Sequence, residues 1–132
     1  VLEDLHHGLA AIDAPAFSLA IDGLDMFGGA RPRTLHAVVT PNAALSRLRA
    51  KVHAVARTAG IEMPRERFVP HVTLARYNRP PAGEDLALLR AFVERRLALR
   101  TPPFEVEEFV LYRSILRQAG AIYEPLAVYP LG

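Results

Sequence analysis

The chain contains no cysteine and a single lysine, Lys51, among its 132 residues. Without cysteine there is no disulfide, no thiolate metal site and no cysteine nucleophile. No apolar run approaches the roughly 18 residues that a membrane span needs, and no signal peptide is recognisable at Val1. We therefore expect a protein of the cytoplasm that does not enter a membrane.

Charge is nearly balanced, with 16 Lys and Arg against 14 Asp and Glu, and a formal net charge of +2. So small a net charge predicts no strong nonspecific attraction to nucleic acid. All cations but one are arginine, whose planar fork suits bidentate contacts to phosphate, although a high-GC codon bias would enrich arginine equally. Hydrophobic residues make up 51% of the chain, which predicts one folded domain with a real core.

The spacing of apolar residues alternates along the chain between the helical period and the strand period. We expect helices near residues 1–11, 41–59 and 86–97, and strands near residues 16–24, 34–40, 69–76, 104–116 and 122–129. Thr40 and Pro41 are typical of a helix start, as N-cap and first helical residue. The order of these elements predicts an α+β fold with helices packed on mostly antiparallel sheet.

Residues 71–76, with the sequence His-Val-Thr-Leu-Ala-Arg, carry the clearest pattern for chemistry. Val72 and Leu74 alternate with His71 and Thr73, which predicts a strand buried on one face with the polar pair on the other. An imidazole that moves a proton and a hydroxyl that holds an oxyanion would then project side by side. The alternative interpretation of His71 is a hydrogen-bonded histidine on the sheet surface. The alternative for Thr73 is that threonine is there only because it favours strands.

The tetrad at residues 71–74, preceded by Phe-Val-Pro and followed by Ala-Arg, resembles the second signature of the 2H phosphoesterases. Within that family the chain is similar to the 2′-5′ RNA ligase-like RNA 2′,3′-cyclic phosphodiesterases. The resemblance implies a bilobed α+β fold, in which antiparallel sheets flank a cleft and helices lie outside. One His-x-Thr tetrad comes from each side of that cleft, and this chain shows one such tetrad convincingly.

The first residues of the chain indicate where the first His-x-Thr tetrad of the family is expected. Val1 is not methionine, and residues 1–9 have the pattern of an amphipathic helix without a cap. In the family, a strand with the first His-x-Thr tetrad precedes a helix like this one. We therefore expect residues 1–132 to form a single 2H phosphoesterase-like domain, incomplete at its N-terminus, with the first tetrad upstream of Val1.

The resemblance implies a metal-independent phosphodiesterase without a cofactor, acting on RNA or nucleotide 2′,3′-cyclic phosphates and producing 2′-phosphates. His71 is expected as one of two acid/base histidines, with Thr73 and Arg76 holding the phosphate. Strand parity puts Arg76 on the face opposite His71 unless the strand ends or bends there. A 2′-5′ RNA ligase side activity is also implied, whereas the sequence gives no indication of an oligomeric state.

The other four histidines are weaker candidates. His36 has Val38 rather than a threonine two positions on, and its strand resembles a family strand in which an aromatic residue commonly takes the place of His36. His6, His7 and His53 are expected on the faces of helices. No two histidines have a spacing typical of a metal site.

Late in the chain, Tyr112, Ser114 and Tyr123 resemble family positions near the cleft, although packing within a hairpin explains them as well. The main alternative function is a catalytically inactive nucleotide- or RNA-binding module of the same fold. A purely structural α+β domain is the third alternative, and it requires the match at residues 68–76 to be a coincidence.

Overall fold

The computed structural model describes all 132 residues, which divide into two compact units. The first unit consists of Val1–Ser18, Asn42–Arg67 and Glu105–Gly132. The second unit consists of Leu19–Pro41 and Phe68–Phe104. The chain therefore passes from one unit to the other four times, and each unit is built from segments that are distant in sequence.

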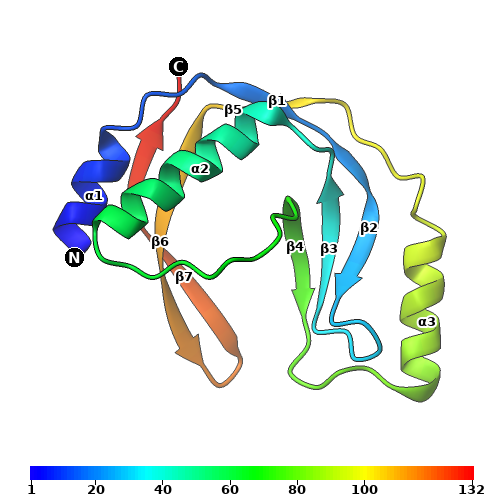
Figure 1. The fold of residues 1–132 in the computed structure, drawn as a ribbon. Helices are drawn as coiled ribbons and strands as arrows, with labels where there is room; N and C mark the ends of the chain where they lie inside the picture. Colours follow the sequence, from blue (N-terminus) through cyan, green and yellow to red (C-terminus); the bar gives the residue numbers. More distant parts are fainter. The chain divides into compact units, whose positions relative to one another are not determined.

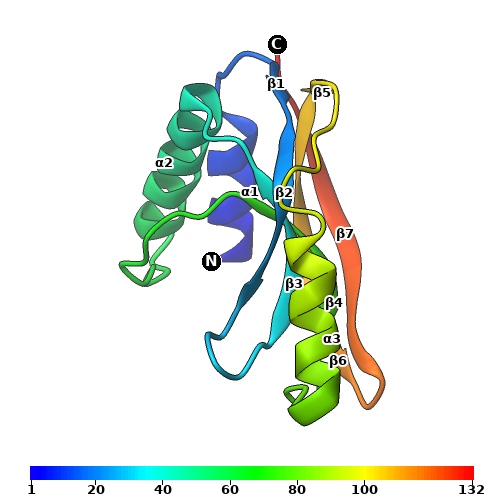
Figure 2. The same ribbon diagram turned by 90° about the vertical axis from the view of Figure 1, so that its right-hand side faces the viewer.

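The first unit contains two helices, α1 (Leu2–Ala10) and α2 (Ala43–Thr58), and a long antiparallel hairpin. The hairpin strands are β6 (Glu108–Arg117) and β7 (Gly120–Pro130). Helices α1 and α2 lie side by side, and α1 also contacts β7 (Figures 1 and 2). Two short strands, β1 (Phe17–Leu19) and β5 (Phe104–Val106), pair with each other in a separate two-stranded sheet.

A glycine allows α1 and α2 to approach closely. A Cβ atom at Gly8 would lie 2.5 Å from Val55 Cγ1, so a larger residue there would force the Val55 side chain or the helices to move. Leu9 of α1 and Leu48 of α2 are buried in the core of this unit. The buried hydroxyl of Tyr129 is hydrogen-bonded to His6 Nδ1 at 2.9 Å, which links α1 to β7.

The second unit is a three-stranded antiparallel sheet with one helix. Its strands are β2 (Ile21–Phe27), β3 (Thr34–Val39) and β4 (His71–Arg76), and their spatial order is β2-β3-β4. Helix α3 (Gly83–Glu94) contacts β2 (Figure 1). Strand β4 is therefore an edge strand that pairs with β3 alone.

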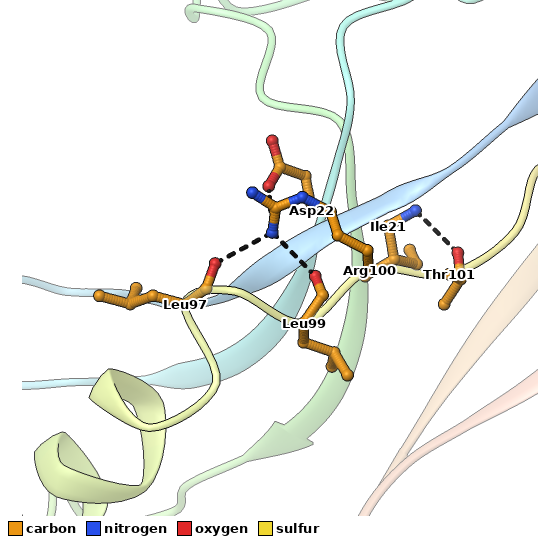
Figure 3. A network of polar contacts seen from close by, with 6 residues as sticks. All are labelled: Ile21, Asp22, Leu97, Leu99, Arg100 and Thr101. Atoms are coloured by element: carbon orange, nitrogen blue, oxygen red, sulfur yellow. Dashed lines mark hydrogen bonds and ion pairs between the residues drawn. The ribbon is translucent and has the colours of Figure 1, made fainter.

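An ion pair fastens the segment after α3 to β2 (Figure 3). Arg100 Nη1 lies 2.7 Å from Asp22 Oδ1. The same nitrogen donates hydrogen bonds of 3.1 Å to the carbonyl oxygens of Leu97 and Leu99. Both charged side chains are about half exposed, so the ion pair contributes about 1 kcal/mol or less.

Backbone contacts reinforce this attachment. Gly23 has a φ of +84°, and a Cβ atom there would lie 2.8 Å from the Leu97 carbonyl oxygen. The Gly23 N–H donates to the Leu99 carbonyl at 2.7 Å, and the Ile21 N–H donates to the Thr101 hydroxyl at 3.0 Å. Glycine is required at position 23 because no side chain fits between the strand and the returning segment.

The α+β class with antiparallel sheets, expected from the order of elements, is confirmed. The predicted start of the middle helix is wrong by two residues. Thr40 directly follows the last residue of β3, and its N–H donates to the Ala20 carbonyl. The N-cap is Asn42, whose side chain accepts from the Leu45 N–H. The strand expected at residues 16–24 is interrupted at Ala20 and continues to Phe27.

The expected burial of Val72 and Leu74 is also wrong, because these side chains are 45% and 54% exposed. Their strand is at the sheet edge, and α3 contacts β2 at the other edge. Alternation of residue types thus predicted the strand correctly, but not what covers it. No helix of the structure combines the length and apolar character that crossing a membrane requires.

Candidate active site

The imidazole of His71 is oriented by the backbone that precedes it. Its Nδ1 lies 2.7 Å from the carbonyl oxygen of Val69. A carbonyl only accepts hydrogen bonds, so Nδ1 carries the proton and Nε2 has the free lone pair in the neutral ring. The His71 residue is exposed. The local geometry therefore gives this histidine a defined tautomer and a nitrogen available for proton transfer.

Strand β4 contains a β-bulge, which changes the parity of its last residues. The register with β3 pairs His71 with Val38, Thr73 with His36, Ala75 with Leu35 and Arg76 with Thr34. Leu74 has no partner and is the extra residue of the bulge.

The bulge brings Arg76 to the face that carries His71 and Thr73. Residues directly opposite each other in an antiparallel pair project to the same face. Thr34 and His36 are two positions apart on β3 and share a face, so Arg76 and Thr73, their partners, also share it. The bulge is thus the bend that Arg76 needs in order to share a face with His71. The three expected site residues lie on one face of the sheet.

Two aromatic rings lie beside His71 on this face. The ring of Phe27 on β2 stacks on His36 with centroids 4.0 Å apart. His71 meets both rings edge-on, with its centroid 4.9 Å from that of Phe27 and 5.3 Å from that of His36. These contacts, together with the bond to the Val69 carbonyl, limit the orientations that the His71 ring can adopt.

His36 is only 1% exposed, and its environment opposes a positive charge. Burial lowers the pKa of His36 below the usual 6.5, and the neighbouring His71 lowers this pKa further, whereas Asp25 acts in the opposite direction. The Nδ1 of His36 has no hydrogen-bond partner, and neither has the buried hydroxyl of Thr34. His36 is therefore a buried ring whose environment disfavours protonation, and it has no access to a substrate. The family resemblance led us to expect a position that aromatic residues commonly take, and its stacking on Phe27 fits such a position.

The remaining candidates belong to the first unit. Tyr112 and Tyr123 face each other across the β6–β7 hairpin, with centroids 6.5 Å apart, and both are about half exposed. Ser114 is the register partner of Tyr123. Packing within the hairpin accounts for these contacts. His6 lies on α1, where it is hydrogen-bonded to Tyr129, and His53 lies on α2. The expectation that both are on helices is confirmed.

No group of three or more His, Cys, Asp or Glu side chains in the structure is close enough together to hold one metal ion. The second-unit sheet instead offers one oriented imidazole, one hydroxyl and one guanidinium on a shared face. In general, an imidazole with a free nitrogen can transfer protons near neutral pH, and hydroxyl and guanidinium groups can donate hydrogen bonds to a phosphate.

A comparison with protein families matches residues 1–117 to the family described as the 2′-5′ RNA ligase superfamily. The chain belongs to this family, as the tetrad at residues 71–74 indicated. The RNA 2′,3′-cyclic phosphodiesterase of Geobacillus stearothermophilus is 36% identical over 124 residues, which are 93% of this chain and 37% of that protein. This chain therefore spans little more than a third of that relative.

A second relative is the RNA 2′,3′-cyclic phosphodiesterase of Aeropyrum pernix, 30% identical over 128 residues, which are 96% of this chain and 71% of that protein. Among solved structures, Escherichia coli LigT complexed with 3′-AMP has a TM-score of 0.67 at 22% identity, covering 98% of this chain and 68% of LigT. A protein of Thermus thermophilus has a TM-score of 0.63 at 26% identity, covering 98% of this chain and 69% of that protein. These structures show that the fold is shared.

Proposed function

We propose that this chain carries half of the active site of an RNA 2′,3′-cyclic phosphodiesterase, which hydrolyses a 2′,3′-cyclic phosphate to a 2′-phosphate. The observation that carries the proposal is the bulge at Leu74, because it aligns His71, Thr73 and Arg76 on one face. The names of the Geobacillus and Aeropyrum relatives support the same activity. The nucleotide bound to LigT supports a site for nucleotides in this fold.

His71 acts as one member of an acid/base pair. Hydrolysis of the cyclic ester requires that water attack phosphorus and that the bond from phosphorus to O3′ break. One histidine takes a proton from the water, and the other gives a proton to O3′ as it leaves. Nε2 of His71 suits either transfer, because the Val69 carbonyl holds the proton on Nδ1.

Thr73 and Arg76 stabilise the phosphoryl oxygens. Negative charge on these oxygens increases in the transition state, so donors already in position lower the barrier. The hydroxyl of Thr73 donates one hydrogen bond, and the guanidinium of Arg76 donates two from a planar fork. With such donors the reaction needs no metal ion and no other cofactor.

The second His-x-Thr tetrad lies, in this proposal, upstream of Val1 in the same domain. His6, His7, His36 and His53 all lack a threonine two positions later. His36 is also buried. The complete domain then has two tetrads, and ligation of a cyclic phosphate end to a 5′-hydroxyl end is a side reaction of the same site.

The test is hydrolysis of 2′,3′-cyclic mononucleotides by the protein that contains this chain, with the products separated chromatographically. We expect 2′-phosphates as products and an unchanged rate after exhaustive treatment with EDTA. A rate lost to EDTA and restored by Zn²⁺ or Mn²⁺ would contradict the metal-independent mechanism. Nucleotide binding by a folded protein without turnover would instead identify the inactive binding module.

A further inference from the structure

A basic pocket lies in the first unit, on the surface of α2. It has a volume of about 360 Å³ and is lined by Arg49, His53, Arg57, Pro64, Arg65 and Glu66. We call these six residues the α2 pocket. Nothing in the sequence patterns pointed to it, because its residues come from a helix and from the irregular segment that follows the helix.

The helical side of the pocket is a regular row of basic groups. Arg49, His53 and Arg57 follow one another at intervals of four residues, so they lie on one face of α2. Four residues advance the helix by about 6 Å. The phosphates of an extended single strand succeed one another at a comparable spacing, so consecutive basic groups are able to meet consecutive phosphates.

The segment after the helix forms the other side of the pocket. The Arg49 guanidinium approaches the carbonyl oxygen of Glu66, with Nη2 at 3.5 Å, and so connects α2 to this segment. Arg65 extends the basic lining from this side. Glu66 supplies the one carboxylate, and no ion pair in the structure involves Arg57, Arg65 or Glu66. The positive charge of these two arginines is therefore not neutralised by the protein.

The electrostatic environment of His53 is consistent with this excess of positive charge. Partial burial lowers the pKa of His53 below its usual 6.5, and the neighbouring Arg49 and Arg57 lower that pKa further. A site that disfavours one more positive charge attracts an anion.

We infer that the α2 pocket binds the backbone phosphates of single-stranded nucleic acid. This inference rests on the proposed function, and it specifies oligonucleotides rather than mononucleotides as the substrate class. The pocket contains no aromatic side chain of Phe, Tyr or Trp on which a base would stack, so its contacts are with the backbone and do not depend on base sequence.

The test is fluorescence anisotropy of a labelled oligouridylate that ends in a 3′-hydroxyl. This probe lacks the cyclic phosphate, so its binding does not require the active-site residues. The variants are Arg57→Gln, Arg65→Gln and the double variant, and Arg47→Gln is the matched control. Arg47 is exposed on the same helix but does not line the pocket, and its substitution removes the same charge.

We expect each pocket variant to weaken binding several-fold and Arg47→Gln to bind like the parent protein. Each lost phosphate contact reduces the slope of log K against log salt by about 0.7 for a single strand, so the double variant loses about 1.4. Single-stranded DNA should bind within a few-fold of RNA, because the contacts are to phosphates.

Equal weakening by Arg47→Gln would show diffuse attraction and would overturn the inference, and so would binding of RNA with no binding of DNA. No binding of the oligonucleotide at low salt would also overturn it. That result would leave the proposed function intact, because hydrolysis is measured on cyclic mononucleotides. Oligonucleotide binding by a protein that hydrolyses no cyclic mononucleotide would support the inference about the α2 pocket and contradict the proposed function.

Discussion

The sheet face of the second unit and the α2 pocket of the first unit both present a histidine with arginine nearby, yet they differ in chemistry. His71 is constrained by a backbone carbonyl and two aromatic rings. His53 lies between Arg49 and Arg57 on a helix. The first arrangement fixes the tautomer and leaves one nitrogen free for proton transfer. The second arrangement accumulates positive charge.

This difference shows that residue type alone does not assign a role. A histidine in an acid/base pair needs a defined orientation, because proton transfer depends on the direction of the nitrogen lone pair. A group that contributes to anion binding needs only positive charge at the right distance. The predictions below separate the two regions by their responses to substitution.

The largest effect is expected for His71→Ala. Removal of one member of the acid/base pair should lower the rate of cyclic mononucleotide hydrolysis by about 10² or more. The fold should persist because the side chain is exposed. Initial rates and circular dichroism are the measurements, with His7→Ala, an exposed histidine of α1, as the control. Near-full activity of folded His71→Ala protein would refute the two-histidine mechanism.

Deletion of Leu74 tests the bulge. With Leu74 deleted, Arg76 stands two positions after Thr73, so regular alternation keeps it opposite Thr34 on the same face. The deletion variant and Leu74→Ala should therefore retain most of the activity. Arg76→Gln loses a charge-assisted hydrogen bond, which contributes about 1.5–3 kcal/mol, so we expect its kcat/KM to fall about 10- to 100-fold. Full activity of Arg76→Gln would show that Arg76 does not contact the phosphate, and a comparable loss in the deletion variant, once its fold is verified by NMR, would contradict the placement of Arg76 by the bulge.

His36→Phe should remove a pH dependence of stability. The pKa of His36 is lowered in the folded state, so the unfolded chain binds more protons as the pH falls through 6.5. The free energy of unfolding of the parent protein therefore decreases below that pH. Phenylalanine keeps the stacking on Phe27 and does not titrate.

The measurement for His36→Phe is urea unfolding at about pH 7.5 and about pH 5.5, on either side of the ordinary histidine pKa. The variant should lose less stability between these two values than the parent protein. An equal loss in both proteins would show that His36 is protonated as readily in the folded state as in the unfolded chain.

The smallest effect is expected in the first unit, for Tyr129→Phe. The variant loses the hydrogen bond between the buried hydroxyl and His6 and keeps the aromatic ring. The free energy of unfolding should decrease by about 1 kcal/mol, and the rate of hydrolysis should not change. Thermal unfolding and the hydrolysis assay measure the two effects. A loss of hydrolysis at constant stability would give this hydrogen bond a role in the site.

Much of the fold followed from local pattern. The helical and strand spacing of apolar residues, including the alternation in residues 71–76, predicted elements that the structure contains. The errors are at points where distant segments meet. Thr40 was expected to cap a helix, but its N–H donates a hydrogen bond to the Ala20 carbonyl. Val72 and Leu74 were expected to be buried, but they lie on an edge strand.

The sequence by itself determined the family, because His71 and Thr73 stand in a tetrad whose spacing is local. It also determined that Arg76 would follow them on the same strand. Only the tertiary structure decided on which face Arg76 lies, because a bulge exists only relative to the partner strand, β3. It also decided that His36 is buried and that α2 has a basic pocket, since burial and pockets arise where segments separated in sequence pack together.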